Sequence, residues 1–237
     1  MKNMKTLSLS LLLFAGASFS SSAQQPTNDN PKPFTDVLMA DSCTFLTRGR
    51  NTYFILEPGY QMSYAGVDGK DSVTLVVTVL KETKKIGNIE TRVIEEKEAV
   101  NGIVTEISRN YFAFCKQTAS VYYFGEDVDE FKNGKLDGHP GAWIAGEKNK
   151  PGVDMPGLVL LGSRYFTEIA PDVAMDRIEI MSIGETYKVP AGTYTNCLRT
   201  QETTPLEPGD KEYKVYAPGI GLLQDENAKL IQYGFVK

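Results

Sequence analysis

The chain has 237 residues, with 25 basic side chains, 30 acidic side chains and one histidine, which gives a formal net charge of −5 at pH 7. An acidic surface repels nucleic acids and anionic lipid headgroups, so both are excluded as main partners. The length is ample to bury a hydrophobic core without disulfide bonds, and it suits one large all-β domain or two small ones.

The N-terminus has the pattern of a secretory signal peptide. Lys2 and Lys5 form a positive n-region, Leu7–Phe19 is apolar and uncharged, and Ser21-Ser22-Ala23 offers a small-residue cleavage site. Residues 1–23 are therefore predicted to be removed on export, leaving a periplasmic or secreted protein with a net charge of −7. The apolar stretch is too short to span a bilayer and no second long apolar run follows, so no transmembrane span is predicted.

Residues 24–50 are predicted to be a flexible leader, because the beginning of this stretch is polar and rich in proline. A short helix or an irregular lead-in at Phe34–Leu46 is the only structure expected there. The folded domain is predicted to begin at Asn51 and to extend to residue 237.

The clearest local signal is a β-hairpin formed by Asn88–Val100 and Ile103–Lys116. Asn101-Gly102 joins the two strands, and this dipeptide favours a type I′ turn because both residues tolerate a positive φ. A two-residue loop fixes the register so that Val100 faces Ile103 and Lys97 lies opposite Glu106, which pairs opposite charges. Beyond the apolar tip, one face is predicted to be exposed to water because it carries Glu90, Arg92, Glu96 and Glu98.

Short strand-like runs separated by turn residues continue along the domain, and no segment after residue 23 shows a sustained helical period. Turns that combine proline and glycine are predicted at Pro190-Ala191-Gly192 and Ala217-Pro218-Gly219. The sequence therefore predicts an all-β fold, a single antiparallel meander that forms a curved, barrel-like or sandwich sheet. Besides the hairpin, the predicted strands are Thr52–Leu56, Tyr60–Ala65, Ser72–Lys81, Val121–Phe124, Ala142–Ala145, Ser163–Ile169, Asp176–Met181, Glu185–Val189, Thr193–Glu202, Lys211–Tyr216, Gly221–Gln224 and Leu230–Val236.

Three cysteines, Cys43, Cys115 and Cys197, lie far apart in the chain. An exported chain with three cysteines forms at most one intramolecular disulfide, and the sequence leaves all three pairings open. No CxxC motif is present, so a redox or zinc-ribbon site is not indicated. The favoured interpretation is that the cysteines are mostly small buried hydrophobic residues.

The sequence contains none of the common catalytic or cofactor-binding motifs. His139 is the only histidine, it lies in a loop rich in glycine and proline, and no GxSxG motif accompanies it. It is therefore interpreted as an exposed loop residue. Nucleotide-binding glycine loops are also absent. No catalytic residue, metal site or cofactor is predicted.

An acidic and aromatic region in the middle of the chain is the candidate ligand-binding region. Its charged run, Glu126 to Glu130, is interpreted as a solvated turn whose spacing matches no calcium loop, and a cation site there is a minor alternative. Its aromatic side chains either line a site for an apolar or sugar molecule or simply pack on the sheet, which is the commoner role. The candidate ligand-binding residues are Tyr122, Tyr123, Phe124, Glu126, Asp127, Trp143 and Asp176.

Four segments of the domain are distinctive: YYFGEDVDEFKNGK (Tyr122–Lys135), PGVDMPG (Pro151–Gly157), EIAPDVAMDRIEI (Glu168–Ile180) and TPLEPGDKEYKVYAPGIGLLQD (Thr204–Asp225). In these segments the chain resembles a family of uncharacterised exported bacterial proteins, and the similarity extends from about Asn51 to the C-terminus. The resemblance implies export and the limits of the domain. Because the family has no assigned activity, the resemblance implies no catalytic residue.

Two functional hypotheses are consistent with the sequence. The first is a non-enzymatic envelope protein whose curved sheet binds an apolar or amphiphilic small molecule, or a partner protein. The predicted export and the lack of catalytic groups favour it. The alternative is a hydrolase that acts on envelope glycans through two carboxyls about 5–9 Å apart across a cleft. That pair would come from Glu126, Asp127, Asp172 and Asp176.

Overall fold

Antiparallel β-strands form almost all of the regular structure in residues 32–236, the part of the chain that the computed structural model describes. The predicted all-β fold is confirmed. The predicted signal peptide, residues 1–23, and the beginning of the predicted leader lie outside the described residues. The only helical element in the described part is one 3-10 turn, η1 (Ala40–Ser42). No helix there has the length and apolar character of a membrane span.

The strands up to the middle of the chain are β1 (Phe45–Leu46), β2 (Gly49–Arg50), β3 (Ile55–Leu56), β4 (Tyr60–Asp68), β5 (Asp71–Ile86), β6 (Ile89–Val100), β7 (Ile103–Cys115), β8 (Val121–Lys132) and β9 (Lys135–Gly138). The later strands are β10 (Trp143–Ile144), β11 (Lys150–Met155), β12 (Arg164–Phe166), β13 (Glu168–Ile169), β14 (Arg177–Val189), β15 (Gly192–Thr203), β16 (Glu212–Ala217), β17 (Gly221–Asp225) and β18 (Ala228–Phe235).

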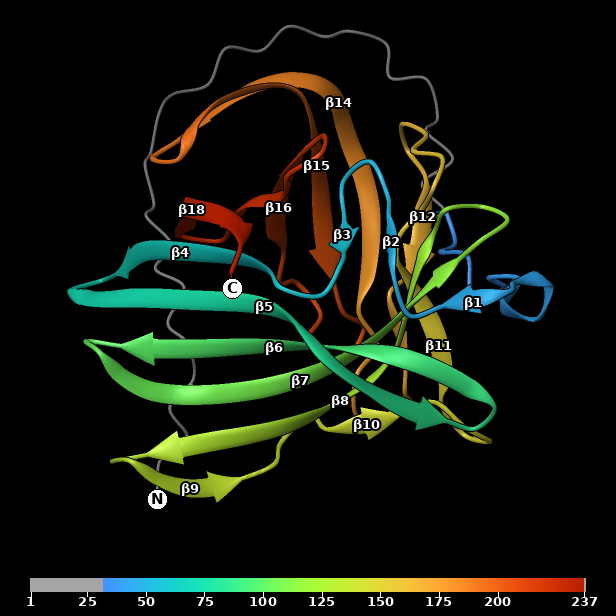
Figure 1. The fold of residues 1–237 in the computed structure, drawn as a ribbon, viewed down its shortest axis with the longest axis horizontal. Helices are drawn as coiled ribbons and strands as arrows, with labels where there is room; N and C mark the ends of the chain where they lie inside the picture. Colours follow the sequence, from blue (N-terminus) through green and yellow to red (C-terminus); the bar gives the residue numbers. More distant parts are fainter. Residues whose placement is uncertain (1–31, 237) are drawn as a thin grey trace, which may run out of the picture. The chain divides into compact units, whose positions relative to one another are not determined.

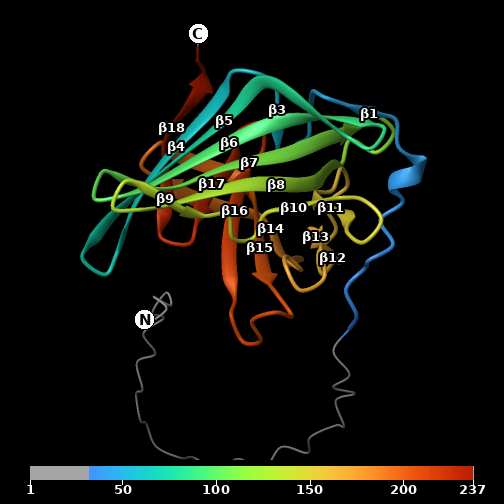
Figure 2. The ribbon, with the colours of Figure 1, turned by 90° about the horizontal axis from the view of Figure 1, so that it is seen from below.

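The main sheet curls round and nearly closes into a barrel (Figure 1). Neighbouring strands follow the order β12, β14, β15, β16, β17, β18, β4, β5, β6, β7, β8, β11 and β13. Figure 2 shows the long strands β4 to β8 side by side, with the β14–β15 hairpin on the other side of the molecule. The pairing of β18 with β4 joins the C-terminal strands to the first long strand of the domain.

The two ends of this order are joined by one short piece of chain. β12 pairs with β14 and β13 pairs with β11, yet only Thr167 separates β12 from β13. The backbone of Gly152 in β11 lies so close that a Cβ there would be 2.0 Å from the carbonyl oxygen of Thr167. Glycine at position 152 therefore permits the close approach that brings the two ends of the sheet together.

The predicted β6–β7 hairpin is present, but its register shifts beyond the turn. Val100 lies opposite Ile103 as predicted, whereas the prediction that Lys97 lies opposite Glu106 is wrong. A β-bulge inserts Thr105, and Glu98 then lies opposite Glu106. Burial, together with the charges of Glu98 and Glu130, raises the pKa of Glu106 to about 7.

The prediction that the charged face of this hairpin is exposed to water is also wrong over part of its length. Glu96 lies opposite Val77 and shares its face with the buried Ile94, so its side chain points into the barrel. Arg92 is buried as well and donates hydrogen bonds to the carbonyl oxygens of Lys81 (2.6 Å) and Thr47 (2.9 Å). These charged side chains are enclosed because the sheet curls round the face that carries them.

Residues 33–50, the later part of the predicted flexible leader, belong to the compact unit Pro33–Lys237, so this unit begins well before Asn51. Cys43 forms a disulfide with Cys115, and β1 pairs with β7 beside it. Phe45 packs edge-on against Tyr122, with ring centroids 5.2 Å apart. Only Cys197 fits the favoured interpretation of the cysteines as small buried residues, since its thiol is free and fully buried.

Candidate functional site

The strands of the barrel line two neighbouring cavities. The first, here called the apolar cavity, has a volume of about 120 Å³ and is lined by residues of β4, β5 and β6 and by residues of β16 and β17. Because side chains alternate between the two faces of a strand, Leu75, Val77 and Val79 of β5 all point into it. The remaining apolar and aromatic lining consists of Tyr53, Phe54, Ile55, Met62, Ile94, Phe112, Tyr216 and Leu222.

Titratable side chains interrupt this apolar lining at Glu96, Asp154, Lys214 and Asp225. Lys214 of β16 lies opposite Asp225 of β17, with its Nζ 3.9 Å from Asp225 Oδ2 and 3.3 Å from Glu202 Oε1. The Lys214 side chain is only 21% exposed, so its ammonium group is largely removed from water. Glu96 and Asp154 have no ion-pair partner among residues 32–236.

The protonation of this group reflects burial and mutual repulsion. Burial raises the pKa of Glu96 to about 8 and the charge of Asp225 adds to the shift, although Lys214 opposes it. Burial likewise raises the pKa of Asp154 to about 7, again opposed by Lys214. Burial by itself lowers the pKa of Lys214, but Asp225 and Glu202 outweigh this effect and the pKa lies well above its ordinary value. Lys214 is therefore charged, while Glu96 and Asp154 change charge near neutral pH.

Two buried hydroxyls beside this group have no hydrogen-bond partner within the described part of the chain. Thr200 is completely buried and lies opposite Lys214 in the β15–β16 pairing, with its Oγ1 unpartnered. Tyr165 is 6% exposed with its hydroxyl unpartnered, and burial together with the charges of Asp154 and Glu202 raises its pKa. Buried polar groups are normally hydrogen-bonded, so these two hydroxyls are exceptions within the wall of the barrel, and neither residue lines one of the two cavities.

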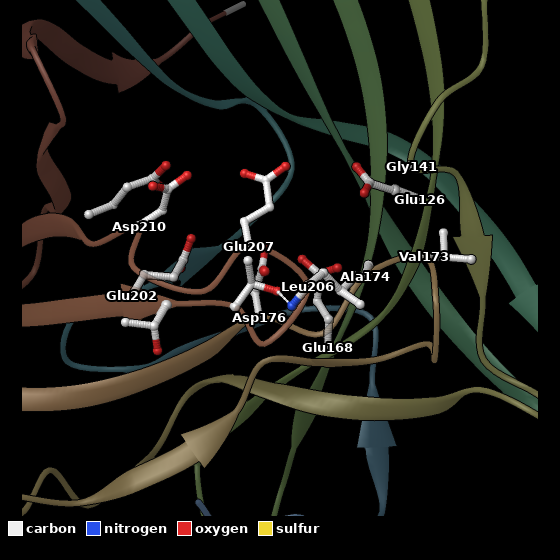
Figure 3. A pocket seen from close by; sticks show the side chains of 13 residues that line it. Glu126, Gly141, Glu168, Val173, Ala174, Asp176, Glu202, Leu206, Glu207 and Asp210 are labelled. Atoms are coloured by element: carbon white, nitrogen blue, oxygen red, sulfur yellow. Dashed lines mark hydrogen bonds between the residues drawn. The ribbon is translucent and has the colours of Figure 1, made fainter. Parts of the chain in front are cut away.

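The second cavity, here called the acidic chamber, has a volume of about 340 Å³ (Figure 3). Figure 3 shows Glu126 of β8, Glu168 of β13 and Glu202 of β15 around one space, with Asp176 just before β14. Burial raises the pKa of Glu126 to about 7, and burial with Asp176 and Glu126 raises that of Glu168 well above its ordinary value. Glu207, Asp210 and Glu212 complete the acidic lining.

The two cavities meet at an ion pair, because Lys214 lines the apolar cavity and its partner Glu202 lines the acidic chamber. The carboxyls are too dispersed for a metal site: within the described residues, no three acidic, cysteine or histidine side chains are placed so that they could hold a metal ion. The arrangement is suited to an organic cation, which forms hydrogen bonds and ion pairs over a larger volume than a metal ion.

The structure brings only part of the predicted site together. Glu126 and Asp176 both line the acidic chamber. Asp127, the next residue along β8, points to the other face and pairs with Lys84 at 2.9 Å. Asp172 lies exposed in the turn between β13 and β14. The prediction that the charged run forms a turn is wrong, because the run continues β8. Its carboxyls therefore alternate between the two faces of the strand and do not converge on one cation.

The predicted aromatic residues pack in the wall of the barrel and line neither cavity. The Tyr122 hydroxyl donates to the carbonyl oxygen of Leu38, and Phe124 packs edge-on against Phe45 with centroids 5.2 Å apart. Tyr123 stacks on Phe112 with ring centroids 4.6 Å apart and packs edge-on against Trp143 with centroids 5.5 Å apart. The commoner structural role of aromatic residues on a sheet therefore accounts for them.

His139 lies outside both cavities. Its Nδ1 is 2.9 Å from Asp129 Oδ1 and 2.7 Å from the carbonyl oxygen of Val128, and its side chain is mostly exposed. Its interpretation as an exposed loop residue agrees with this position.

None of the four titratable residues that line the apolar cavity was predicted from the sequence. Glu96, Asp154, Lys214 and Asp225 are separated by up to 129 positions and come together only when the sheet curls round. One local signal was available: Lys214 shares a strand face with the buried Tyr216, which is unusual for lysine.

Replacing Glu96 by glutamine is expected to stabilise the protein at high pH and to change little at about pH 5. The pKa of Glu96 is raised in the folded state, so its contribution to stability is complete below about 4.5 and is lost as the pH rises through about 8. Glutamine never ionises, and at about pH 9 the variant should be about 2 to 4 kcal/mol more stable than the wild type. Denaturant unfolding at both pH values measures this, with the exposed Glu147→Gln as the charge-matched control. Equal effects of the two variants would contradict the prediction.

Comparison with protein-family models, with curated proteins and with solved structures finds no match for this chain.

Proposed function

We propose that the mature protein is an exported, non-enzymatic binding protein that takes up a small amphiphilic cation inside its barrel. The apolar part of the ligand occupies the apolar cavity, and its ammonium group lies beside Glu96 and Asp154. The observation that carries the proposal is the placement of two carboxyls without ion-pair partners, among residues 32–236, in the wall of an apolar cavity.

The cavity limits the apolar part of the ligand to a small group. An apolar protein cavity of about 150 Å³ holds one benzene molecule, so a volume of about 120 Å³ suits a small ring or a short alkyl chain. Burying such a group contributes about 2 kcal/mol of binding free energy. This contribution alone gives weak binding, so a polar interaction must supply the remaining affinity and the specificity.

The polar interaction that fits this wall is with a cation. Lys214 already places an alkylammonium group against Glu202 and Asp225, which supports the chemistry of ammonium recognition at this position. A ligand ammonium beside Glu96 and Asp154 would favour the ionised forms of both carboxyls.

Calorimetric titration with hexylammonium, hexanol and hexanoate tests this proposal, because the three probes share a chain length and differ in charge. Hexylammonium is expected to bind most tightly and hexanoate most weakly. The affinity for hexylammonium should rise between about pH 6 and about pH 9, because Asp154 and Glu96, with pKa values of about 7 and about 8, become ionised over this range. Equal affinity for all three probes, or no binding of hexylammonium, would contradict the proposal.

Two variants locate the binding. Val77→Phe fills the apolar cavity and should abolish binding of both hexylammonium and hexanol. Val76→Phe adds the same volume on the opposite face of β5 and should leave binding intact. Glu96→Gln should weaken hexylammonium by about tenfold and leave hexanol unchanged, because it removes one charge-assisted interaction.

The alternative, a glycan hydrolase, is supported by one observation in the acidic chamber. Glu126, with a pKa of about 7, lines the same space as Asp176, and a raised pKa suits a general acid. Opposing this, no aromatic side chain of residues 32–236 lines the chamber to stack on a sugar ring. Release of reducing ends from peptidoglycan fragments by the wild type, lost in Glu126→Gln, would establish the alternative. No release by the wild type would eliminate it.

A further inference from the structure

A third cavity lies on the outer face of the barrel, beneath the loop that joins β15 to β16. This outer cavity has a volume of about 570 Å³. Arg177 of β14 lies opposite Thr203 of β15, and both line it. Their neighbours Ile178 and Glu202 also lie opposite each other, and Glu202 lines the acidic chamber. The outer cavity adjoins the acidic chamber, because Thr203, Thr204 and Asp210 line both, but it shares no lining residue with the apolar cavity.

The outer cavity is basic in an otherwise acidic protein. Arg164, Arg177 and Lys211 line it, against Glu179 and Asp210. The Nε of Arg164 lies 3.3 Å from Glu179 Oε2. Arg177 forms no ion pair within the described residues, and its one hydrogen bond there runs from Nε to Thr203 Oγ1, at 3.2 Å. Arginines that are partly buried, as Arg177 is, are usually paired with a carboxylate. An arginine that faces a cavity and has no carboxylate partner among the described residues is therefore unusual.

Phe34 holds the two guanidinium groups in place. Its ring centroid lies 4.1 Å from the guanidinium carbon of Arg164 and 4.4 Å from that of Arg177. The backbone of the neighbouring Thr35 fixes the ring, because its N–H donates to the carbonyl oxygen of Arg164 at 2.9 Å. Stacking against a ring immobilises a guanidinium while leaving its N–H edge available, and a fixed N–H edge matches the two oxygens of a carboxylate or phosphate.

We infer that the outer cavity binds a small organic oxyanion, a carboxylate or phosphate ester, through the terminal nitrogens of Arg177. Pro205, Pro208 and Phe34 provide apolar walls for the body of the ligand. The volume is that of a small-molecule site and exceeds what a bare phosphate would fill. Lys211 adds a second positive charge at the same cavity. The inference does not depend on the proposed function, since the outer cavity shares no lining residue with the apolar cavity and takes a ligand of opposite charge.

Titration of the full mature chain with phenyl phosphate and with benzoate, followed by backbone amide NMR shifts, tests this inference. At least one of the two is expected to bind saturably and to shift the amides of Gln201 and Thr203. The probe that binds more tightly identifies the preferred oxyanion, a phosphate ester or a carboxylate. Benzamide, which is neutral and has the same ring, should bind at least about tenfold more weakly than benzoate if the carboxylate arm is the tighter one.

Arg177→Gln should weaken binding by about tenfold or more, and Arg177→Lys should also weaken it, because lysine keeps the charge and loses the bidentate edge. The Lys variant keeps the test valid if the Gln variant does not fold. Arg109→Gln removes an arginine that is paired with Glu95 on another strand and should leave binding unchanged. Absence of saturable binding by both probes, or wild-type affinity in both Arg177 variants, would overturn the inference.

Discussion

Replacing Lys214 by methionine is expected to destabilise the protein by about 3 to 5 kcal/mol at about pH 9, a large share of the stability of a typical domain. Lys214 is the cation that holds Glu202 and Asp225, and it opposes the burial-driven rise in the pKa values of Glu96 and Asp154. Methionine fills a similar volume but leaves these carboxyls buried without a counter-charge. Because 21% of the Lys214 side chain is exposed to solvent, we expect a loss of stability near the lower end of this range.

The loss should shrink as the pH falls. Without Lys214 the folded-state pKa values of Glu96, Asp154 and Glu202 rise further above their unfolded values. A group of this kind contributes stability that is complete below its unfolded pKa of about 4.5 and is lost as the pH rises through its folded pKa. Unfolding by urea at about pH 5 and about pH 9 measures the difference. The exposed Lys188→Met removes the same charge and should change stability by less than about 0.5 kcal/mol at either pH. A Lys214→Met effect that does not depend on pH would contradict this account.

Removing the disulfide between Cys43 and Cys115 is expected to lower stability by about 3 to 4 kcal/mol. The bridge spans 72 residues, and closing a loop of that length restricts the unfolded chain strongly. It also fixes the segment that carries β1 and Phe45 against the barrel wall. The double variant Cys43→Ala, Cys115→Ala should therefore unfold at a lower denaturant concentration, and residues 33–46 should gain susceptibility to proteolysis.

The third cysteine supplies the control for this experiment. Cys197→Ala removes a buried thiol without touching the bridge, and should cost about 1 kcal/mol through the small cavity it leaves. Alkylation of the denatured, unreduced wild type should label one cysteine, Cys197. Labelling of all three, or a double variant as stable as Cys197→Ala, would show that the bridge does not contribute as described.

The fold class was predictable because alternation and turn chemistry are local properties. Asn101-Gly102 specified the hairpin and the first pair of its register. The sequence did not reveal the bulge at Thr105, since no residue type there demands one. The early segment was mistaken for a flexible leader because its order depends on a disulfide and on contacts with β7 and β8, which are distant in sequence.

The site was less predictable for a related reason. Alternation shows that Glu96 and Glu98 share a face, but it does not show whether that face meets bulk water or an enclosed space. Only the curling of the sheet, completed by the β18–β4 pairing, decides this. Glu126 and Asp176 were selected on the assumption of a turn cluster, whereas they line one cavity from β8 and from the residue before β14.

The way the sheet ends also bears on how the protein behaves among other chains. Long strands with an unpaired side recruit strands from neighbouring molecules, which is a common route to fibres. Here the pairing order terminates in β12 and β13, which are three and two residues long and belong to one covalent stretch around Thr167. The sixteen-residue β5 has a partner on each side. A longer open edge remains on β14, because its pairing with β12 covers only Arg177–Glu179. Strand addition by another chain is therefore expected along the rest of β14, up to Val189, and not at β12 or β13.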